Sequence, residues 1–156
     1  MGKLDGNSKV YYKDGQPYYD RNYKMDIRDG NSKEYYKDGQ LQYDRNYKKG
    51  ELDGNSKEYY KDGQLEHDRN YKISKNGKYT TEHGIQKIYH ENGQLKSEIN
   101  YTEGKMDGTL KIFDKKGQLT FENTFKMGLM NGTLKEYYRG KLTRTAKFKN
   151  GKRIWN

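Results

Sequence analysis

The stretch "DGNSKEYYKDGQL" occurs at residues 29–41 and again, letter for letter, at 53–65, and a near copy, "DGNSKVYYKDGQP", stands at 5–17. Each copy holds two glycine-containing turn signals, and the segment between them is too short for a typical helix. Repetition of this kind is typical of repeat proteins, in which each short module packs against its neighbours. The interval between copies therefore predicts the organisation of the whole chain.

The first glycine of the stretch recurs at intervals of 24, 24, 30, 24 and 24 residues, as Gly6, Gly30, Gly54, Gly84, Gly108 and Gly132. The long interval carries six extra residues within 71–84, which predicts an expanded loop. A second glycine follows nine residues after the first in five repeats and eight residues after it in the sixth. The spacing predicts one repeat array over 1–156, with units at about 4–27, 28–51, 52–81, 82–105, 106–129 and 130–156.

Each unit is predicted to be a β-hairpin, because Asp-Gly or Asn-Gly separates segments rich in Tyr, Phe, Ile and Thr. Three apolar columns follow the repeat, and we expect them to form one stripe on one face. They are Tyr11, Tyr35, Tyr59, Tyr89, Phe113 and Tyr137; Pro17, Leu41, Leu65, Leu95, Leu119 and Leu142; and Tyr23, Tyr47, Tyr71, Tyr101, Phe125 and Phe148. The predicted fold class is all-β, an elongated single-layer antiparallel sheet of six tandem β-hairpins.

Two pairings of the hairpin strands compete. A two-residue Asp-Gly turn sets Lys33 opposite Asp44, a cross-strand ion pair worth about 0.2–1 kcal/mol. A three-residue loop with a glycine bulge sets Tyr35 opposite Leu41 and places the three columns on one face. Burial of an aromatic or Leu side chain is worth about 1.5–3 kcal/mol, so we expect the bulged hairpin.

Composition alone would suggest disorder, because Leu, Ile, Val and Phe make up only 22 of 156 residues and the formal charge is +10. The 17 tyrosines, placed in phase with the repeat, argue against it. Residues 126–156 carry nine basic side chains and one acidic one. The basic charge therefore acts at the C-terminal end.

Nothing in the sequence predicts catalysis, a metal site or a cofactor. His67, His83 and His90 show no metal-ligand spacing and no acidic partner arrangement, and we interpret His67 and His90 as substitutes in tyrosine positions. An acidic residue recurs once per unit, which we interpret as strand-face charge offset by neighbouring lysines. These residues are Asp20, Asp44, Asp68, Glu98 and Glu122.

Two sets of residues are candidates for binding. In four units a tyrosine directly follows the first apolar column, so alternation predicts an aromatic row on the opposite face. This row either shields the sheet or binds a partner. Its residues are Tyr12, Tyr36, Tyr60 and Tyr138. The second set is a candidate for anionic surfaces: Arg139, Lys141, Arg144, Lys147, Lys149, Lys152 and Arg153. Its alternatives are a solubilising cap, which we favour, and nucleic-acid binding, which lacks an accompanying motif and ranks last.

Three stretches resemble a known family: "KEYYKDGQLQYDRNYKKGELDG" (33–54), "IYHENGQLKSEINYTEGKMDG" (88–108) and "EYYRGKLTRTAKFKNGKR" (136–153). They resemble MORN repeats, and more closely the bacterial MORN repeat variant. The resemblance implies scaffolding, membrane association or partner binding, and the variant includes the YwqK antitoxin family of toxin–antitoxin systems. Two departures predict irregular backbone, namely Asp26 in the place of a loop glycine and the insertion at 71–84.

Two functions remain as hypotheses. The first is a non-catalytic bacterial protein-binding module, as an antitoxin or immunity protein would be, which implies a cytoplasmic location. The second is a membrane-associated or cell-surface scaffold, which implies a signal sequence removed from a longer protein. The chain begins inside a repeat, since "GKLDG" at 2–6 matches "GKMDG" at 104–108, which fits either a natural start at Met1 or a piece of a longer protein.

Overall fold

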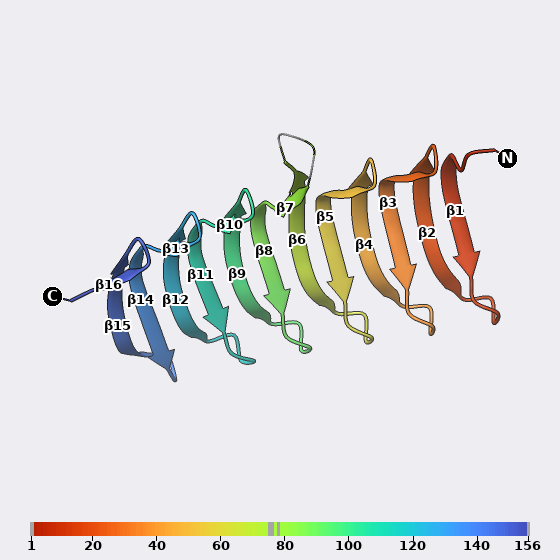
Figure 1. Ribbon diagram of the computed structural model, residues 1–156. Coiled ribbons are helices and arrows are strands. Elements are labelled where there is room, and N and C mark those ends of the chain that lie inside the picture. The colour runs from red at the N-terminus through yellow and green to blue at the C-terminus, as the bar shows by residue number, and fades with distance from the viewer. Residues whose placement is uncertain (1, 75–76, 78, 156) are drawn as a thin grey trace. The chain divides into compact units, whose positions relative to one another are not determined.

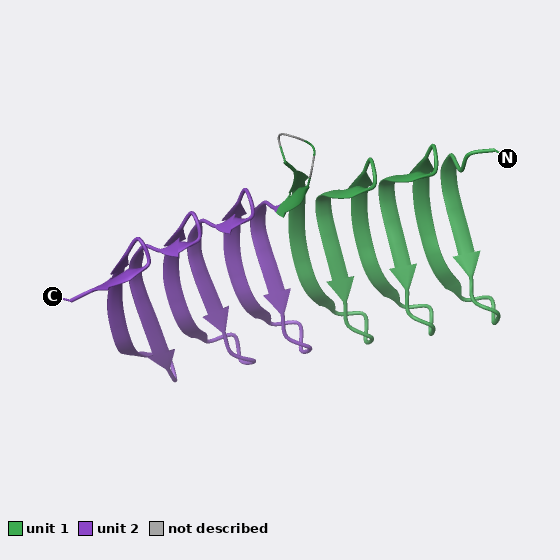
Figure 2. Cartoon of the chain, in the orientation of Figure 1, with its two compact units in different colours: residues 1–81 green, residues 82–156 purple. Residues whose placement is uncertain are grey.

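The computed structural model describes residues 2–74, 77 and 79–155. The chain divides into two compact units, residues 1–81 and 82–156 (Figure 2). The described residues form β-strands, turns and loops and contain no helix, so the all-β fold class is confirmed. No helix capable of spanning a membrane occurs among them.

Unit 1 is an antiparallel meander in which consecutive strands are neighbours, in the order β1-β2-β3-β4-β5-β6, while β7 pairs with β6 (Figure 1). Its strands are β1 (Gly6–Tyr11), β2 (Pro17–Lys24), β3 (Ile27–Tyr35), β4 (Leu41–Lys48), β5 (Glu51–Tyr59), β6 (Leu65–Ile73) and, at the boundary, β7 (Thr80–Glu82). Three tandem hairpins thus form one layer, as predicted.

Unit 2 repeats this plan in the order β8-β9-β11-β12-β14-β15-β16, with β10 paired to β9 and β13 to β12. Its strands are β8 (Gly84–Tyr89), β9 (Leu95–Thr102), β10 (Lys105–Met106), β11 (Gly108–Phe113), β12 (Leu119–Lys126), β13 (Leu129–Met130), β14 (Gly132–Tyr138), β15 (Lys141–Lys149) and β16 (Lys152–Ile154). The short strands β10, β13 and β16 lie at the end of the hairpins opposite the longer loops (Figure 1).

Two kinds of turn alternate along the chain. Within a repeat, the Tyr36 amide donates to the Gln40 carbonyl at 2.8 Å and the Gly39 amide to the Tyr36 carbonyl at 2.9 Å. Gly39 has a φ of 86°, so this is the predicted three-residue loop closed by a glycine bulge. Between repeats, Lys49 and Gly50 both have positive φ, of 51° and 86°, as in a two-residue type I′ turn.

The strand pairing combines the two alternatives that the sequence analysis treated as exclusive. Tyr35 pairs with Leu41 beside the loop, as predicted, but Lys33 pairs with Asp44 farther along. Both occur because Gln42 is an extra, unpaired residue in β4, a second bulge that shifts the register by one. The choice of one pairing to the exclusion of the other was therefore wrong.

This second bulge reverses the alternation of side chains beyond it. One face of the sheet carries Lys33, Asp44 and their counterparts in the other repeats, and we call it the charge-ladder face. The other carries Ser32, Arg45 and their counterparts, and we call it the core face.

The prediction that the three apolar columns share one face is wrong. By register Tyr35 and Leu41 lie on the charge-ladder face, whereas Tyr47 lies on the core face. In agreement, Tyr23 of the third column interacts with the Arg21 side chain on the core face. Each face of the single layer is therefore partly covered by its own aromatic column.

The most buried side chains come from a cross-strand pair that the sequence did not single out. The pairs are Ser32 with Arg45, Ser56 with Arg69, Gln86 with Ile99, Leu110 with Asn123, and Leu134 with Ala146. In these pairs Ser32, Ser56, Gln86, Ile99, Asn123, Leu134 and Ala146 are buried. The core therefore follows the centre of each hairpin on the core face, while the predicted columns flank it.

The two predicted irregularities have different outcomes. Met25 and Asp26 adopt φ of 50° and 68°, the same left-handed pair as at the other two-residue turns, so the prediction of irregular backbone at Asp26 is wrong. The Asp26 carboxylate accepts a hydrogen bond from the Leu4 amide at 2.6 Å, which helps to hold the turn. The insertion extends β6 into a hairpin with β7, and its residues 75, 76 and 78 lie outside the described part of the chain.

Candidate functional site

The three-residue loops form an exposed, polar edge in each unit. The Asp38 carboxylate accepts the Gln40 amide at 3.1 Å, and the Asp114 carboxylate accepts the Lys116 and Gln118 amides at 2.9 Å each. These bonds stabilise the turn, as Asp does in Asx turns. The neighbouring lysines, among them Lys37 and Lys116, remain exposed.

Three of the four tyrosines predicted as a binding row, Tyr12, Tyr36 and Tyr60, are half-buried, and two of them contact the next repeat. The Tyr36 hydroxyl donates to the Tyr59 carbonyl at 2.8 Å, and the Tyr12 hydroxyl to the Tyr35 carbonyl at 3.4 Å. Burial raises the pKa of the Tyr36 hydroxyl. These contacts give Tyr12 and Tyr36 a shielding, structural role.

The same contact is made in unit 2 by a histidine. The His90 Nε2 lies 3.0 Å from the Phe113 carbonyl, as expected for a substitute in a tyrosine position. We call these contacts between successive loops rungs.

A groove of about 480 Å³ opens between the loops of unit 1. It is lined by Asp14, Tyr36, Lys37, Asp38 and Lys61, so its two carboxylates and two ammonium groups balance. Tyr60, the third predicted tyrosine, is half-buried like Tyr36.

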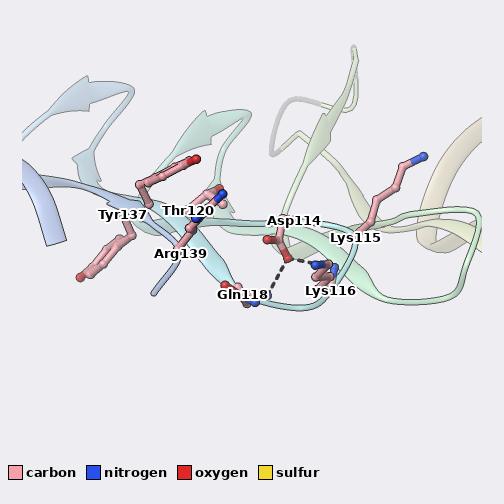
Figure 3. Close-up of a pocket in the computed structure, with 8 residues that line it drawn as sticks. Asp114, Lys115, Lys116, Gln118, Thr120, Tyr137 and Arg139 are labelled. Atoms are coloured by element: carbon pink, nitrogen blue, oxygen red, sulfur yellow. Dashed lines mark hydrogen bonds between the residues drawn. The ribbon is translucent and has the colours of Figure 1, made fainter. Parts of the chain in front are cut away.

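A cleft of about 420 Å³ lies at the last hairpin of unit 2 (Figure 3). Its lining residues are Asp114, Lys115, Lys116, Gln118, Thr120, Tyr137, Tyr138 and Arg139. Three of them are cationic and one is anionic, and the single carboxylate is hydrogen-bonded to its own loop. The cleft therefore offers positive charge beside two aromatic rings.

Two local changes in sequence create this cleft. Asp114 occupies the position of Tyr36 and bonds its own loop instead of reaching the next hairpin. The one-residue deletion replaces the last three-residue loop with a tight turn at Arg139 and Gly140, which have φ of 50° and 74°. Tyr138, the fourth predicted tyrosine, is consequently 64% exposed, with the Arg139 guanidinium 5.2 Å from its ring centre.

The seven predicted basic residues are all exposed, but the strand register distributes them over both faces. Lys147, Lys149 and Lys152 lie on one side of β15 and β16, with Lys149 directly opposite Lys152. Arg144 lies on the other side, 3.1 Å from the Glu136 carboxylate. Arg153 stacks over the exposed Trp155 at 4.0 Å.

The recurring acids pair with lysines, as predicted. Lys33 stands between Asp20 and Asp44 in the sheet, and the alternation continues through the other repeats of unit 1. The closest contacts are Lys9 with Asp20 at 3.1 Å and, in unit 2, Lys135 with Glu122 at 2.9 Å.

His67 differs from its prediction, which gave it no acidic partner. Its Nδ1 lies 3.3 Å from the Glu58 carboxylate, and Glu66 contributes a second carboxylate to the cluster. Ligand atoms of these three residues lie within 4.8 Å of one another. Burial, more than any other influence, lowers the pKa of His67, which favours the neutral imidazole.

Comparison with protein families identifies five matching segments. The model described as MORN repeat variant matches residues 4–25, 28–49, 52–72, 82–103 and 106–127. These segments correspond to the first five hairpins, and the sixth is the hairpin with the shortened loop. Comparison with curated proteins finds no match.

Proposed function

The chain belongs to the MORN repeat variant family, whose members are generally repeat modules often used in binding, and from this premise we propose a non-catalytic protein-binding module. The partner surface would be an acidic segment of another protein. The site would be the cleft in unit 2, and the observation that carries the proposal is the exposed Tyr138 beside Arg139 and two loop lysines.

The chemistry of the cleft supports an acidic protein partner. Tyr and Arg are enriched at the centres of protein interfaces, because they provide large contact area and directional hydrogen bonds. Lys115, Lys116 and Arg139 contribute positive charge that attracts carboxylates and speeds association. The ring of Tyr138 offers the apolar contact that a solvated lysine patch lacks.

The tyrosines of unit 1 enter the proposal as a secondary surface. Tyr36 lines the groove between loops, and Tyr12 and Tyr60 occupy equivalent positions in their repeats. These three side chains are half-buried, and the hydroxyls of Tyr12 and Tyr36 hydrogen-bond backbone carbonyls of the sheet. We therefore assign them a smaller share of partner binding than Tyr138.

The biological role that we propose is that of a bacterial antitoxin or immunity-like protein acting in the cytoplasm. The partner would then be a toxin that presents an acidic surface. A repeat module without its own catalytic centre can neutralise such a partner by covering its functional surface.

Affinity capture from the source organism, followed by mass spectrometry, tests the proposal. The variant Lys116→Glu/Tyr138→Ser changes the cleft, and Lys24→Glu/Tyr79→Ser makes the same chemical changes at exposed positions of unit 1 that line neither the cleft nor the groove. We expect a partner captured by the wild type to be lost from the cleft variant and kept by the matched control. A partner kept equally by both variants contradicts the cleft as its site.

A second candidate function is attachment to an anionic membrane surface. The excess of nine basic over one acidic side chain in residues 126–156 favours it, and each charge near such a surface contributes about 1 kcal/mol. Lys147, Lys149 and Lys152 share one side and would form the contact. Under this alternative the protein acts as a scaffold, at the inner membrane surface or outside the cell.

Co-sedimentation with vesicles tests the alternative. Glu substitutions at Lys147, Lys149 and Lys152 remove the proposed contact, and Glu substitutions at Lys13, Lys37 and Lys61 change the net charge equally. Pelleting with phosphatidylserine vesicles that only the first variant loses supports membrane attachment. Equal loss in both variants indicates attraction by net charge alone.

A further inference from the structure

Repeats two and three are almost identical in sequence, so their few differences can be compared directly. Residues 29–48 and 53–72 are identical except at two adjacent positions, where Gln42 and Tyr43 of the second repeat correspond to Glu66 and His67 of the third. Both substitutions introduce side chains that bind metal ions. The residue across the hairpin, Glu58, is already acidic and pairs with His67 in the strand register.

The second bulge brings these side chains together. In a regular strand, neighbours such as Glu66 and His67 point to opposite faces. Glu66 is the extra residue of β6, because Tyr59 pairs with Leu65 and Glu58 with His67, and a bulge can re-aim a side chain in this way. One potential ligand atom from each of Glu58, Glu66 and His67 consequently lies within 4.8 Å of the other two.

We propose that Glu58, Glu66 and His67 form a binding site for a divalent transition-metal ion, with Zn²⁺ as the best fit. Zinc takes nitrogen and carboxylate ligands at about 2.0–2.1 Å in a tetrahedron, which places neighbouring ligand atoms about 3.3–3.4 Å apart. The Nδ1 of His67 and the Glu58 oxygen are already 3.3 Å apart. Small side-chain rotations of Glu66 complete the triad, and a water would take the fourth position.

The surroundings suit a cation of this kind. The Nδ1 of His67 is buried and faces the Glu58 carboxylate at 3.3 Å, so a bound cation would lie between these two ligand atoms. Tyr43 pairs with Glu58 in the strand register, so its side chain lies beside this carboxylate, as outer-shell groups do at metal sites. Arg69, 3.9 Å from Glu58, offsets one of the two carboxylate charges and leaves the cluster acidic.

The choice of metal follows from the ligands. Imidazole nitrogen suits zinc, copper, iron and nickel, whereas calcium and magnesium prefer sites made of oxygen alone. The second repeat has no comparable site, because Tyr43 there stacks under Arg45 at 3.6 Å and Gln42 carries no charge.

Calorimetric titration of the intact protein with ZnCl₂ tests the proposal. We expect about one Zn²⁺ per chain for the wild type, and no measurable binding for Glu66→Gln/His67→Tyr. That variant copies the sequence of repeat two and should therefore fold. His83→Asn, a change at an exposed histidine, should bind as the wild type does.

A change at the third ligand makes the test sharper. Glu58→Gln removes the carboxylate of the facing strand and should abolish measurable zinc binding. A wild type that binds no zinc overturns the proposal, as does undiminished binding by Glu66→Gln/His67→Tyr. Undiminished binding by Glu58→Gln also overturns it, because the facing carboxylate would then not be a ligand.

Discussion

The same position of the hairpin holds Arg45 and Arg69 in unit 1 but Ile99 and Ala146 in unit 2. In unit 1 the core face is a polar network, in which the Arg21 guanidinium lies 3.0 Å from Glu34. The aromatic rings there serve as partners for arginine.

In unit 2 the corresponding face carries more apolar side chains, alongside the buried Gln86 and Asn123. Ile112 pairs with Phe121, and Leu134 with Ala146. The first five repeats have the same loop and the same second bulge in both units, so these features do not depend on what fills the core face. The comparison teaches that hydrogen bonds and ion pairs dominate the core face of unit 1, whereas apolar burial contributes more on the core face of unit 2.

The largest expected effect comes from making unit 2 resemble unit 1. Leu134→Ser introduces the residue of repeat two at a buried position and should destabilise unit 2 by about 2–5 kcal/mol, because it removes apolar burial and leaves a small cavity. Urea unfolding followed by circular dichroism measures the change.

A leucine on the same hairpin provides the control. Leu142 is 53% exposed, so Leu142→Ser should change stability by less than about 0.5 kcal/mol. Equal effects at both positions would show that unit 2 does not depend on its apolar core face.

The second prediction replaces a buried polar side chain of unit 2 with an apolar one. Asn123 is fully buried, and its amide nitrogen and oxygen have no hydrogen-bond partner among the described residues. Asn123→Ile introduces the residue of the preceding repeat and should stabilise unit 2 by about 1–3 kcal/mol, because it removes an uncompensated buried amide. Thermal and urea unfolding midpoints should both rise.

A second asparagine serves as the contrast. Asn100 donates to the Asp107 carbonyl at 2.9 Å, so Asn100→Ile should destabilise the protein instead. A loss of stability in Asn123→Ile would mean that the buried amide is satisfied.

A smaller effect concerns the rungs, which the two units build from different residues. Tyr36→Phe keeps the ring and removes the hydrogen bond to the Tyr59 carbonyl, so unit 1 should lose about 0.5–1.5 kcal/mol. Tyr138→Phe, at a 64% exposed ring, should leave the urea midpoint unchanged. Equal midpoints for the two variants would remove the structural role assigned to Tyr36.

Much of the fold follows from local signals in the sequence. The regular glycines predicted the hairpins and the three-residue loops, because positive φ is specific to few residue types. The second bulge has no such signal, since the extra residue is Gln42, Glu66 or Thr120 in different repeats. Without the bulge, the faces of the aromatic columns could not be assigned correctly.

Sequence alone predicted only those residues of the candidate sites that lie in the last repeat. Tyr138 and Arg139 were named from sequence, whereas the cleft beside them needs the shortened turn and the loop of Asp114. The cluster of Glu66 and His67 was missed, because it requires two sequence neighbours on one side of a strand. The buried column was missed because its residues are Ser and Arg in the first three repeats.

The smallest expected effect is a pH dependence at the edge of unit 1. A hydrogen bond from Asn7, together with Lys9, lowers the pKa of Asp20 below its ordinary value. As the pH falls through the unfolded value of about 3.9, the unfolded chain takes up the proton first, so stability present at neutral pH is lost. Asp20→Asn should therefore cost about 0.2–1 kcal/mol at pH 7 and progressively less toward pH 3.

Urea midpoints across this range measure the difference, with Glu91→Gln at an exposed loop residue as the control. A difference between wild type and Asp20→Asn that stays constant from pH 7 to pH 3 contradicts the assignment, because the carboxylate would then not be the group that stabilises this edge.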